Sequence, residues 1–495
     1  MNYHEPEIAR SSLSNRVLQG GVWIFAFRLS KQILGFIRIV ILARLLAPND
    51  FGLFGIALLT LSVFDTFSQT GFGEALVQKS GDISKYLDIS WTVTMVRGVV
   101  LFCLIFFSAP TIAAFFDSTQ ATLFIRIIAL SILLKACINV GVIYFPKQLI
   151  FDKQFTFDLA TNLVDFVVAI TAALLLRNAW ALVFGSLAGN MTRLGLSYHL
   201  HPYRPRLQWD WVKIKELLGF GKWIWAATAL VFLVNQGDDL VVGRMLGTAA
   251  LGFYQMAYRI ANLTATEIAE VVARVAFPAY ARLQDEKNSL RKAFMDTTRL
   301  TLFISTLPMI LIVLLAADLT EVVLGKKWMP MVPAMQVLAL VGLARAVAAT
   351  TRPVLLAVAR PDVETKLKIL QLFLLAGAIV PLTIKWEILG TSIAVLVSAG
   401  VMAIASGVAA SKLIACHNRH LFTSVIYPLI CTMAVCALHF LVKPYFPDTG
   451  GLQIAVSLTI LVGAYLAVAA VLDKFFGYGI RTILQKRVID VMSKQ

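Results

Sequence analysis

The chain has 495 residues, of which 59% are hydrophobic and 15% charged, with a formal net charge of +16 and a mean hydropathy of +0.79. Soluble domains carry about 25% charged residues, so this composition excludes a soluble globular protein and predicts an integral membrane protein. In a membrane protein a positive net charge first reflects basic cytoplasmic loops, so it does not point to nucleic-acid binding.

Apolar stretches of about 20 residues recur along the whole chain, and each is long enough to cross roughly 30 Å of hydrocarbon. We predict an all-α membrane protein of about 14 transmembrane helices with no sizeable soluble domain between them. Their approximate ranges are 17–42, 51–71, 87–109, 121–145, 159–177, 179–199, 219–243, 252–276, 296–316, 333–357, 367–385, 388–412, 422–442 and 452–472.

Basic residues are distributed unequally between the two sides that these spans define. With the N-terminus inside, the cytoplasmic segments carry 24 lysines and arginines. The opposite side carries seven, which are Arg44, Arg177, Arg244, Lys326, Lys327, Lys385 and Lys443. This asymmetry predicts that both termini are cytoplasmic.

The first span and the turn after it recur 200 residues later, because 18–57 and 218–257 align without a gap. Among the matched pairs are Gly52 with Gly252 and Arg44 with Arg244. We therefore expect a six-helix lobe over 1–200, a cytoplasmic linker over 201–218, a second lobe over 219–415, and two further helices with a tail over 416–495. Parallel repeats commonly place a transporter's substrate path between the two halves.

Thirteen basic residues lie within the apolar spans or at their edges. They are Arg28, Lys31, Arg38, Arg97, Arg126, Lys135, Arg193, Lys222, Arg259, Arg274, Arg299, Arg345 and Arg352. A basic side chain at the bilayer centre costs at least about 2.5–3.5 kcal/mol, so several of these must face water or protein.

The opening helix carries three of these cations on one face. At roughly 100° per residue, Arg28, Lys31 and Arg38 fall within an arc of about 80°. Four cations lie near the middle of their spans, where a hydrated cavity and a buried ion pair are both open interpretations: Arg28, Arg97, Lys135 and Arg345. Arg126 lies about 180° from Lys135 on its helix, so one cavity cannot receive both side chains.

Acidic residues inside the spans also allow two interpretations. Asp65, Asp165, Asp238 and Asp239 could bind protons or sodium ions, or each could neutralise a neighbouring arginine. In the eighth span Arg259, Glu267, Glu270 and Arg274 share an arc of about 80°, which fits either a coupling or gating role or a self-neutralised structural seam.

The chain lacks the signatures of an enzyme or an ATPase. No G-x-x-x-x-G-K-[ST] loop is present, and His417 and His420 stand alone without further metal ligands. We therefore expect no nucleotide hydrolysis, no covalent chemistry, no metal and no cofactor.

Five stretches together resemble one known family. They are GGVWIFAFRLSKQIL, ARLLAPNDFGLFGIA, TGFGEALVQ from Thr70, GRMLGTAALGFYQMAYRIANL from Gly243, and FPAYARLQDEKNSLRKAF from Phe277. The combination is similar to the Wzx-type flippases, the polysaccharide-transporter branch of the multidrug/oligosaccharidyl-lipid/polysaccharide (MOP) superfamily, and most similar to the colanic-acid-exporter group.

That resemblance implies two six-helix lobes forming a V, as in the MATE transporters, plus two C-terminal helices. It implies a bacterial inner-membrane protein that moves polyprenyl-diphosphate-linked oligosaccharides outward by alternating access, together with a polysaccharide polymerase and export machinery. The family's cationic cavity corresponds to Arg28, Lys31 and Arg38, and further to Lys135 and Arg345. Coupling to protons or sodium ions, a lipid II flippase and a cation-coupled drug exporter remain open alternatives.

Overall fold

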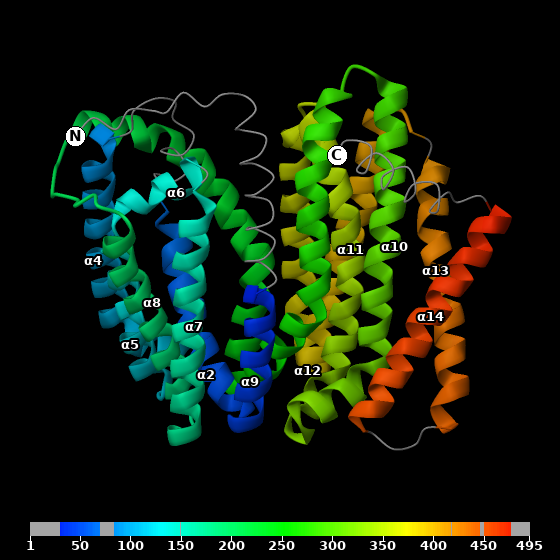
Figure 1. Ribbon diagram of the computed structural model, residues 1–495, viewed down its shortest axis with the longest axis horizontal. Helices are drawn as coiled ribbons and strands as arrows, with labels where there is room; N and C mark the ends of the chain where they lie inside the picture. The colour runs from blue at the N-terminus through cyan, green and yellow to red at the C-terminus, as the bar shows by residue number, and fades with distance from the viewer. Residues whose placement is uncertain (1–29, 70–83, 149, 417, 446–449, 477–495) are drawn as a thin grey trace. The chain divides into compact units, whose positions relative to one another are not determined.

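The computed structural model describes residues 30–69, 84–148, 150–416, 418–445 and 450–476, and these are almost entirely helical without any β-strand. The first described helix covers 30–45. It is followed by α2 (Pro48–Phe67), α4 (Ser84–Phe115), α5 (Ala121–Ala136), η1 (Val140–Ile143), α6 (Tyr144–Lys147), α7 (Phe151–Leu176), α8 (Trp180–Leu200), α9 (Trp211–Arg282), α10 (Lys287–Leu319), η2 (Thr320–Leu324), η3 (Lys326–Met331), α11 (Val332–Ala357), α12 (Pro361–Leu413), α13 (Asn418–Val442), η4 (Lys443–Tyr445) and α14 (Gly451–Phe476) (Figure 1). The predicted all-α membrane fold is confirmed.

Two of these helices are each broken into two spans. A continuous helix of 72 residues (α9) or 53 residues (α12) would be about 110 or 80 Å long, far more than a bilayer requires. The backbone of α9 breaks at Gly247 (φ 83°), and that of α12 breaks at Trp386 and Glu387. With these breaks the described helices follow the order of the 14 predicted spans.

Length and apolar composition alone give a lower count, in which α12 is one helix and the first helix, α8 and α9 do not qualify. Eight of the described helices then qualify as membrane spans, or nine if α5 and the short helices after it form one bent span. The protein is thus a multi-pass membrane protein.

The chain divides into two compact units. Unit 1 comprises Met1–Phe232 with Gly247–Gly252, and unit 2 comprises Leu233–Leu246 with Phe253–Gln495. In unit 1 the first helix packs on α7 and α8 through buried aliphatic residues, among them Leu42, Leu46, Ala169 and Leu182. In unit 2, α13 and α14 pack on α10 around Tyr465, whose hydroxyl donates to the carbonyl of Phe303 at 3.0 Å.

The span predicted over 121–145 is not one straight helix. Helix α5 ends at Ala136, and the chain bends by 72° into η1 and α6. Asn139 fixes the bend, because its side-chain oxygen accepts a hydrogen bond from Gly141 N at 2.9 Å and thereby begins a new helix. We call the end of unit 1 that carries this bend the α6 end.

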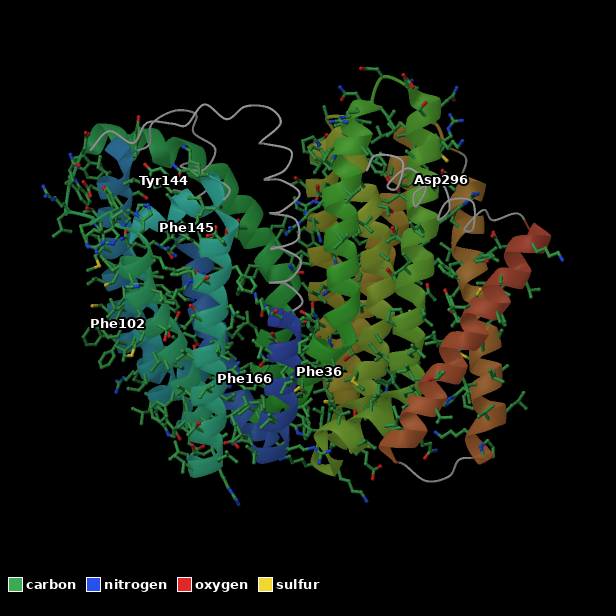
Figure 2. The ribbon with its side chains drawn as sticks, viewed as in Figure 1. Phe36, Phe102, Tyr144, Phe145, Phe166 and Asp296 are labelled. Carbon is green, nitrogen blue, oxygen red and sulfur yellow. The ribbon has the colours of Figure 1, made fainter. Side chains whose placement is uncertain are left out.

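An extended segment over 201–210 is bound across the α6 end. Asn139 Nδ2 donates to the carbonyl of Tyr203 at 2.6 Å, and the Tyr203 hydroxyl donates to Asp88 Oδ1 at 2.7 Å. His201 stacks on Tyr144, which Figure 2 shows beside Phe145 on α6. Burial, together with the charges of Lys153 and Arg204, lowers the pKa of His201, so its neutral ring can accept the hydrogen bond from Tyr203 N.

The opposite end of unit 1, which we call the turn end, gathers three turns at 46–47, 116–120 and 177–179. Asp50 joins two of them. Its Oδ2 accepts from Ala47 N at 2.8 Å at the start of α2, and its Oδ1 accepts from Ala179 N at 3.0 Å at the start of α8. Both carboxylate oxygens therefore satisfy helix-terminal N–H groups that have no partner within their own helices.

Candidate functional site

Two basic side chains line one cavity of about 500 Å³ at the α6 end of unit 1. They are Lys135, an exposed residue near the end of α5, and Arg193, on α8. The bend after α5 makes the cavity, because η1 and α6 turn aside and form one wall, while Asp158 and Gln154 enter from α7. Arg126 instead lines a different cavity, in agreement with its predicted separation from Lys135.

Arg193 is held in place from two directions. Its Nη2 pairs with Asp158 Oδ1 at 2.9 Å, and its guanidinium carbon lies 5.0 Å from the centre of the Phe157 ring. A guanidinium has five N–H donors, so this single carboxylate contact leaves others available to an anion. Asp158 also experiences the positive charge of Lys31 on the first helix.

The cationic face of the first helix lies against an acidic face of α7. Lys31 and Arg38 are seven residues apart, and so are Asp158 and Asp165, which places each pair on one face of its helix. Arg38 Nη2 donates to Asp165 Oδ1 at 3.0 Å. Two α8 glycines leave room for this contact, since a Cβ on Gly185 would lie 2.9 Å from Asp165 Oδ1 and one on Gly189 would lie 3.0 Å from Asp165 Cβ.

The Arg38–Asp165 pair is more than four-fifths buried on the arginine side, and the Nε–H of Arg38 has no hydrogen-bond partner. We expect Asp165→Ala to cost about 3–5 kcal/mol, since it leaves an uncompensated buried cation. The double variant R38M/D165L is expected to recover most of that loss, because it removes both charges. Thermal unfolding of the purified proteins measures both effects.

The double variant R38M/D165L also distinguishes between two roles for Arg38. If Arg38 contacts substrate, R38M/D165L is stable but inactive in export. If the pair is a structural element alone, the double variant exports normally.

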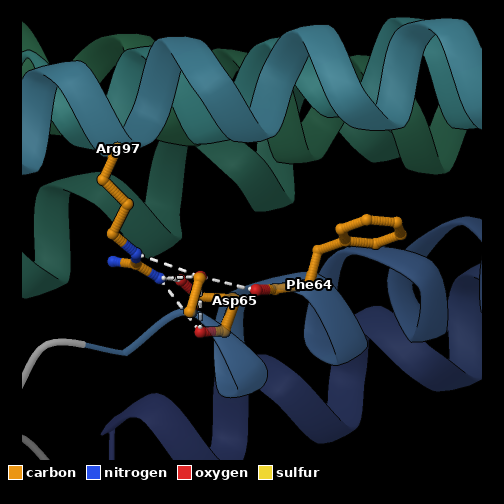
Figure 3. Close-up of polar contacts among 4 residues, drawn as sticks. Phe64, Asp65 and Arg97 are labelled. Carbon is orange, nitrogen blue, oxygen red and sulfur yellow. Dashed lines mark hydrogen bonds and ion pairs between the residues drawn. The ribbon is translucent and has the colours of Figure 1, made fainter.

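Asp65 also pairs with an arginine (Figure 3). Arg97, on α4, reaches the C-terminal end of α2, where its guanidinium contacts the Asp65 carboxylate, donates to the Asp65 carbonyl at 3.0 Å, and donates from Nε to Ser68 Oγ at 3.0 Å. A cation at a helix C-terminus is stabilised by the helix dipole and by the unpaired carbonyls. Arg97 therefore caps α2, and Asp65 has a neighbouring counter-charge.

Unit 2 contains a partly buried polar network around two adjacent carboxylates. Asp238 is 2% exposed and accepts a hydrogen bond from the Tyr254 hydroxyl at 2.6 Å. Asp239 accepts one from Gln255. Arg345, on α11, donates to the Tyr258 hydroxyl, and its charge acts on Asp238. The sequence predicts Asp238 and Asp239 as acids inside a span, and the structure adds Tyr254 and Tyr258.

The structure places several of the predicted site residues in neither the α6-end cavity nor the Asp238 network. Arg28 lies outside the described residues, as do the side chains of Glu267 and Glu270. Arg259 is exposed on the second part of α9. Over the part of the chain that the structure describes, no group of three or more His, Cys, Asp or Glu side chains could hold a metal ion.

Two charged residues of the α6-end cavity are not predicted from the sequence. Arg193 is one of the thirteen basic residues in or beside the spans, but its place in the sequence gives it no role. Asp158 precedes the predicted span 159–177 by one residue, although α7 begins at Phe151. The sequence does contain one indication of the contact between the first helix and α7. Lys31 and Arg38 are seven residues apart, as are Asp158 and Asp165, so a basic helix face and an acidic helix face have the same spacing.

The chain matches a family model described as polysaccharide biosynthesis protein over residues 41–333. It is 25% identical over 371 residues to the lipopolysaccharide biosynthesis protein WzxC of Escherichia coli (strain K12), covering 74% of this chain and 75% of that one. It is 25% identical over 354 residues to the teichuronic acid biosynthesis protein TuaB of Bacillus subtilis (strain 168), covering 71% and 73%.

Solved structures show the same fold at 13% identity. The lipid II flippase MurJ in an inward closed conformation matches with a TM-score of 0.72 over 91% of this chain and 99% of that one. An inward-facing MATE family multidrug resistance transporter of the MOP superfamily matches with a TM-score of 0.58 over 77% and 95%. The chain therefore belongs to the polysaccharide biosynthesis protein family and is a multi-pass membrane protein with the fold of MOP-superfamily transporters.

Proposed function

We propose that this protein is a flippase that moves polyprenyl-diphosphate-linked oligosaccharides from the cytoplasmic to the outer leaflet of the bacterial inner membrane. The family and the names of the relatives support a role in polysaccharide assembly. The observation that carries the proposal is the convergence of Lys135 and Arg193 on one cavity. In this proposal both termini and the α6 end are cytoplasmic, in accordance with the distribution of basic residues.

The charges around this cavity match the proposed ligand. Lys31, Lys135 and Arg193 supply three positive charges, and Asp158 supplies one negative charge. A diphosphate that links a lipid to a sugar carries two negative charges, so the group balances it. Arg193 offers the paired donors that suit a phosphate, and Lys135 offers a mobile point charge. The phosphates would take over the donors of Arg193 that Asp158 leaves free.

Alternating access would then carry the head group across the bilayer while the polyprenyl tail stays in lipid. This activity makes no covalent bond and needs no cofactor, in line with the expectations from sequence. A basic cavity is unfavourable for cationic drugs, which weighs against a multidrug exporter. The likeness to a lipid II flippase is one of fold, and it does not favour lipid II as the substrate.

The direct test is depletion of the protein in its host. We expect the lipid-linked oligosaccharide to accumulate on the cytoplasmic leaflet and the surface polysaccharide to disappear, as measured by leaflet-specific labelling and glycan staining. Undiminished surface polysaccharide in the depleted strain would rule out the function. Accumulation of lipid II, or sensitivity to cationic drugs, would instead identify one of the alternatives.

We propose further that the Asp238–Asp239 pair couples transport to a proton or sodium gradient. Two adjacent carboxylates inside a membrane span, one of them buried, are costly unless a cation or proton is bound. Replacing Asp238 with asparagine keeps the shape but removes one charge. Export in proteoliposomes should then lose its dependence on an imposed gradient. We expect the export rate under the gradient to decrease by about 5- to 150-fold, the range that corresponds to a typical coupling free energy.

A matched control is Asp362→Asn, which changes a carboxylate that is about half exposed in the same unit. It should leave the gradient dependence unchanged. If Asp238→Asn lowers thermal stability and yet transport still responds fully to the gradient, then Asp238 only neutralises Arg345.

A further inference from the structure

A second cavity, of about 480 Å³, lies at the turn end of unit 1 and plays no part in the proposed diphosphate site. Three separate segments line it, which are the start of α2, the turn into α5 with the first turns of that helix, and the turn into α8. Asp50 ties the α2 and α8 segments together through its two backbone hydrogen bonds. These two parts of the cavity lining are therefore fixed relative to one another before any ligand arrives.

One wall of this cavity is apolar and aromatic. Trp180 and Phe124 stack with their ring centres 4.4 Å apart, and Leu53 and Leu123 also line the cavity. Phe124 is 7% exposed, whereas Trp180 is only partly buried. The indole N–H of Trp180 has no hydrogen-bond partner among the described residues and is not sealed off from the surface. A flat ring with a free donor is typical of sites that bind ligands with both apolar and polar faces.

The rest of the cavity lining is polar but nearly uncharged. Gln120, Thr119 and Thr122 line it, and their side chains make no hydrogen bond to the rest of the described chain. Asn178 uses its side-chain oxygen to cap α8 through Trp180 N at 3.2 Å, which leaves its amide N–H₂ available. These groups include both donors and acceptors, as a ligand rich in hydroxyl groups requires.

The net charge distinguishes this cavity from the one at the α6 end. Its two charged residues are Asp50 and Arg126, which balance each other, and both have partners in the protein. The Arg126 guanidinium donates from Nε to the carbonyl of Phe106 at 3.2 Å and lies over the Phe106 ring. A diphosphate would find no net positive charge here, but a saccharide needs none.

We propose that the turn-end cavity binds the saccharide part of the exported molecule, with Trp180 and Gln120 as its main contacts. The inference rests on the proposed function, and it adds a binding site at the end opposite the diphosphate site. In the proposed topology the turn end is the outer end, so this site receives the sugars after the head group has crossed.

The test uses the full-length protein in lipid nanodiscs and two separate probes. One probe is the oligosaccharide released by mild acid hydrolysis from the host's polyprenyl diphosphate lipids, and the other is inorganic pyrophosphate. We expect Trp180→Leu and Gln120→Ala each to weaken oligosaccharide binding by roughly tenfold, as measured by saturation-transfer NMR titration. Both variants should bind pyrophosphate as the wild type does, which also shows that they are folded.

Trp386→Leu is the matched control, because Trp386 is an exposed tryptophan at a helix junction outside this cavity. Oligosaccharide binding that is absent in the wild type, or equal in the wild type and both cavity variants, would overturn the inference. Failure of pyrophosphate binding alone would count against the diphosphate site of the proposed function and leave the saccharide result to stand on its own.

Discussion

Replacing Lys135 or Arg193 with alanine is expected to weaken pyrophosphate binding by about 10- to 150-fold each and to reduce polysaccharide export severely. The estimate takes the contribution of a hydrogen bond to a charged group as about 1.5–3 kcal/mol. The double variant K135A/R193A should abolish export, because only Lys31 then remains to balance Asp158 and the two phosphate charges. Titration of the purified protein and a surface glycan assay measure the two effects.

Arg193→Lys provides the sharper form of this experiment. It keeps the positive charge but loses the planar set of donors, so we expect binding intermediate between that of the wild type and Arg193→Ala. Lys366→Ala is the control, since that side chain is 77% exposed outside the cavity. Normal export by K135A/R193A at wild-type expression would show that the cavity is not the diphosphate site.

The overall architecture could be predicted because its signals are local or repetitive. A stretch of 20 apolar residues predicts a span without reference to the rest of the chain, and the 200-residue register reveals the duplication. The bend after α5 was missed because it depends on Asn139, whose side chain also binds the segment at 201–203. Nothing within 121–145 alone distinguishes this asparagine from a polar residue in a straight helix.

The partners of the intramembrane charges could be predicted only in part. Periodicity placed Lys31 and Arg38 on one face, but it could not identify Asp165, which lies 127 residues further along the chain, as the group that meets Arg38. The interpretation that an acid neutralises an arginine describes both Asp65 with Arg97 and Asp165 with Arg38. The roles of Lys31, Lys135, Arg38 and Arg345 toward substrate stay predictions that the variants above address.

Gly52→Ala and Gly252→Ala are each expected to prevent accumulation of folded protein. A Cβ on Gly52 would lie 1.7 Å from the carbonyl oxygen of Thr248, and a Cβ on Gly252 would lie 2.0 Å from the carbonyl oxygen of Pro48. Backbone atoms cannot rotate aside as a side chain can, so two chain segments must separate. Overpacking of a tight contact typically lowers the free energy of unfolding by about 1–3 kcal/mol. Because the backbone itself must move here, we expect the loss in these variants to reach or exceed the upper end of that range.

The 200-residue register explains why both glycines are present. Gly52 contacts Thr248, and Gly252 contacts Pro48. In the repeat, Gly252 corresponds to Gly52 and Thr248 corresponds to Pro48, so the second contact repeats the first with the two copies exchanged. The contact is thus reciprocal, as in a symmetric interface. A glycine that repeats for this reason serves the architecture, whereas Lys31 and Arg38 of the first helix have no basic counterpart in the second copy.

Gly35→Ala is the control for these variants, because Gly35 lies within the first helix and a Cβ there would meet nothing within 4 Å. Alanine has the higher helix propensity, so Gly35→Ala should leave stability unchanged or raise it by up to about 1 kcal/mol. Fluorescence-detected size-exclusion chromatography and thermal unfolding in detergent compare the three variants. A Gly52→Ala protein that folds and melts like the wild type would show that the close contact at Gly52 is not required for folding.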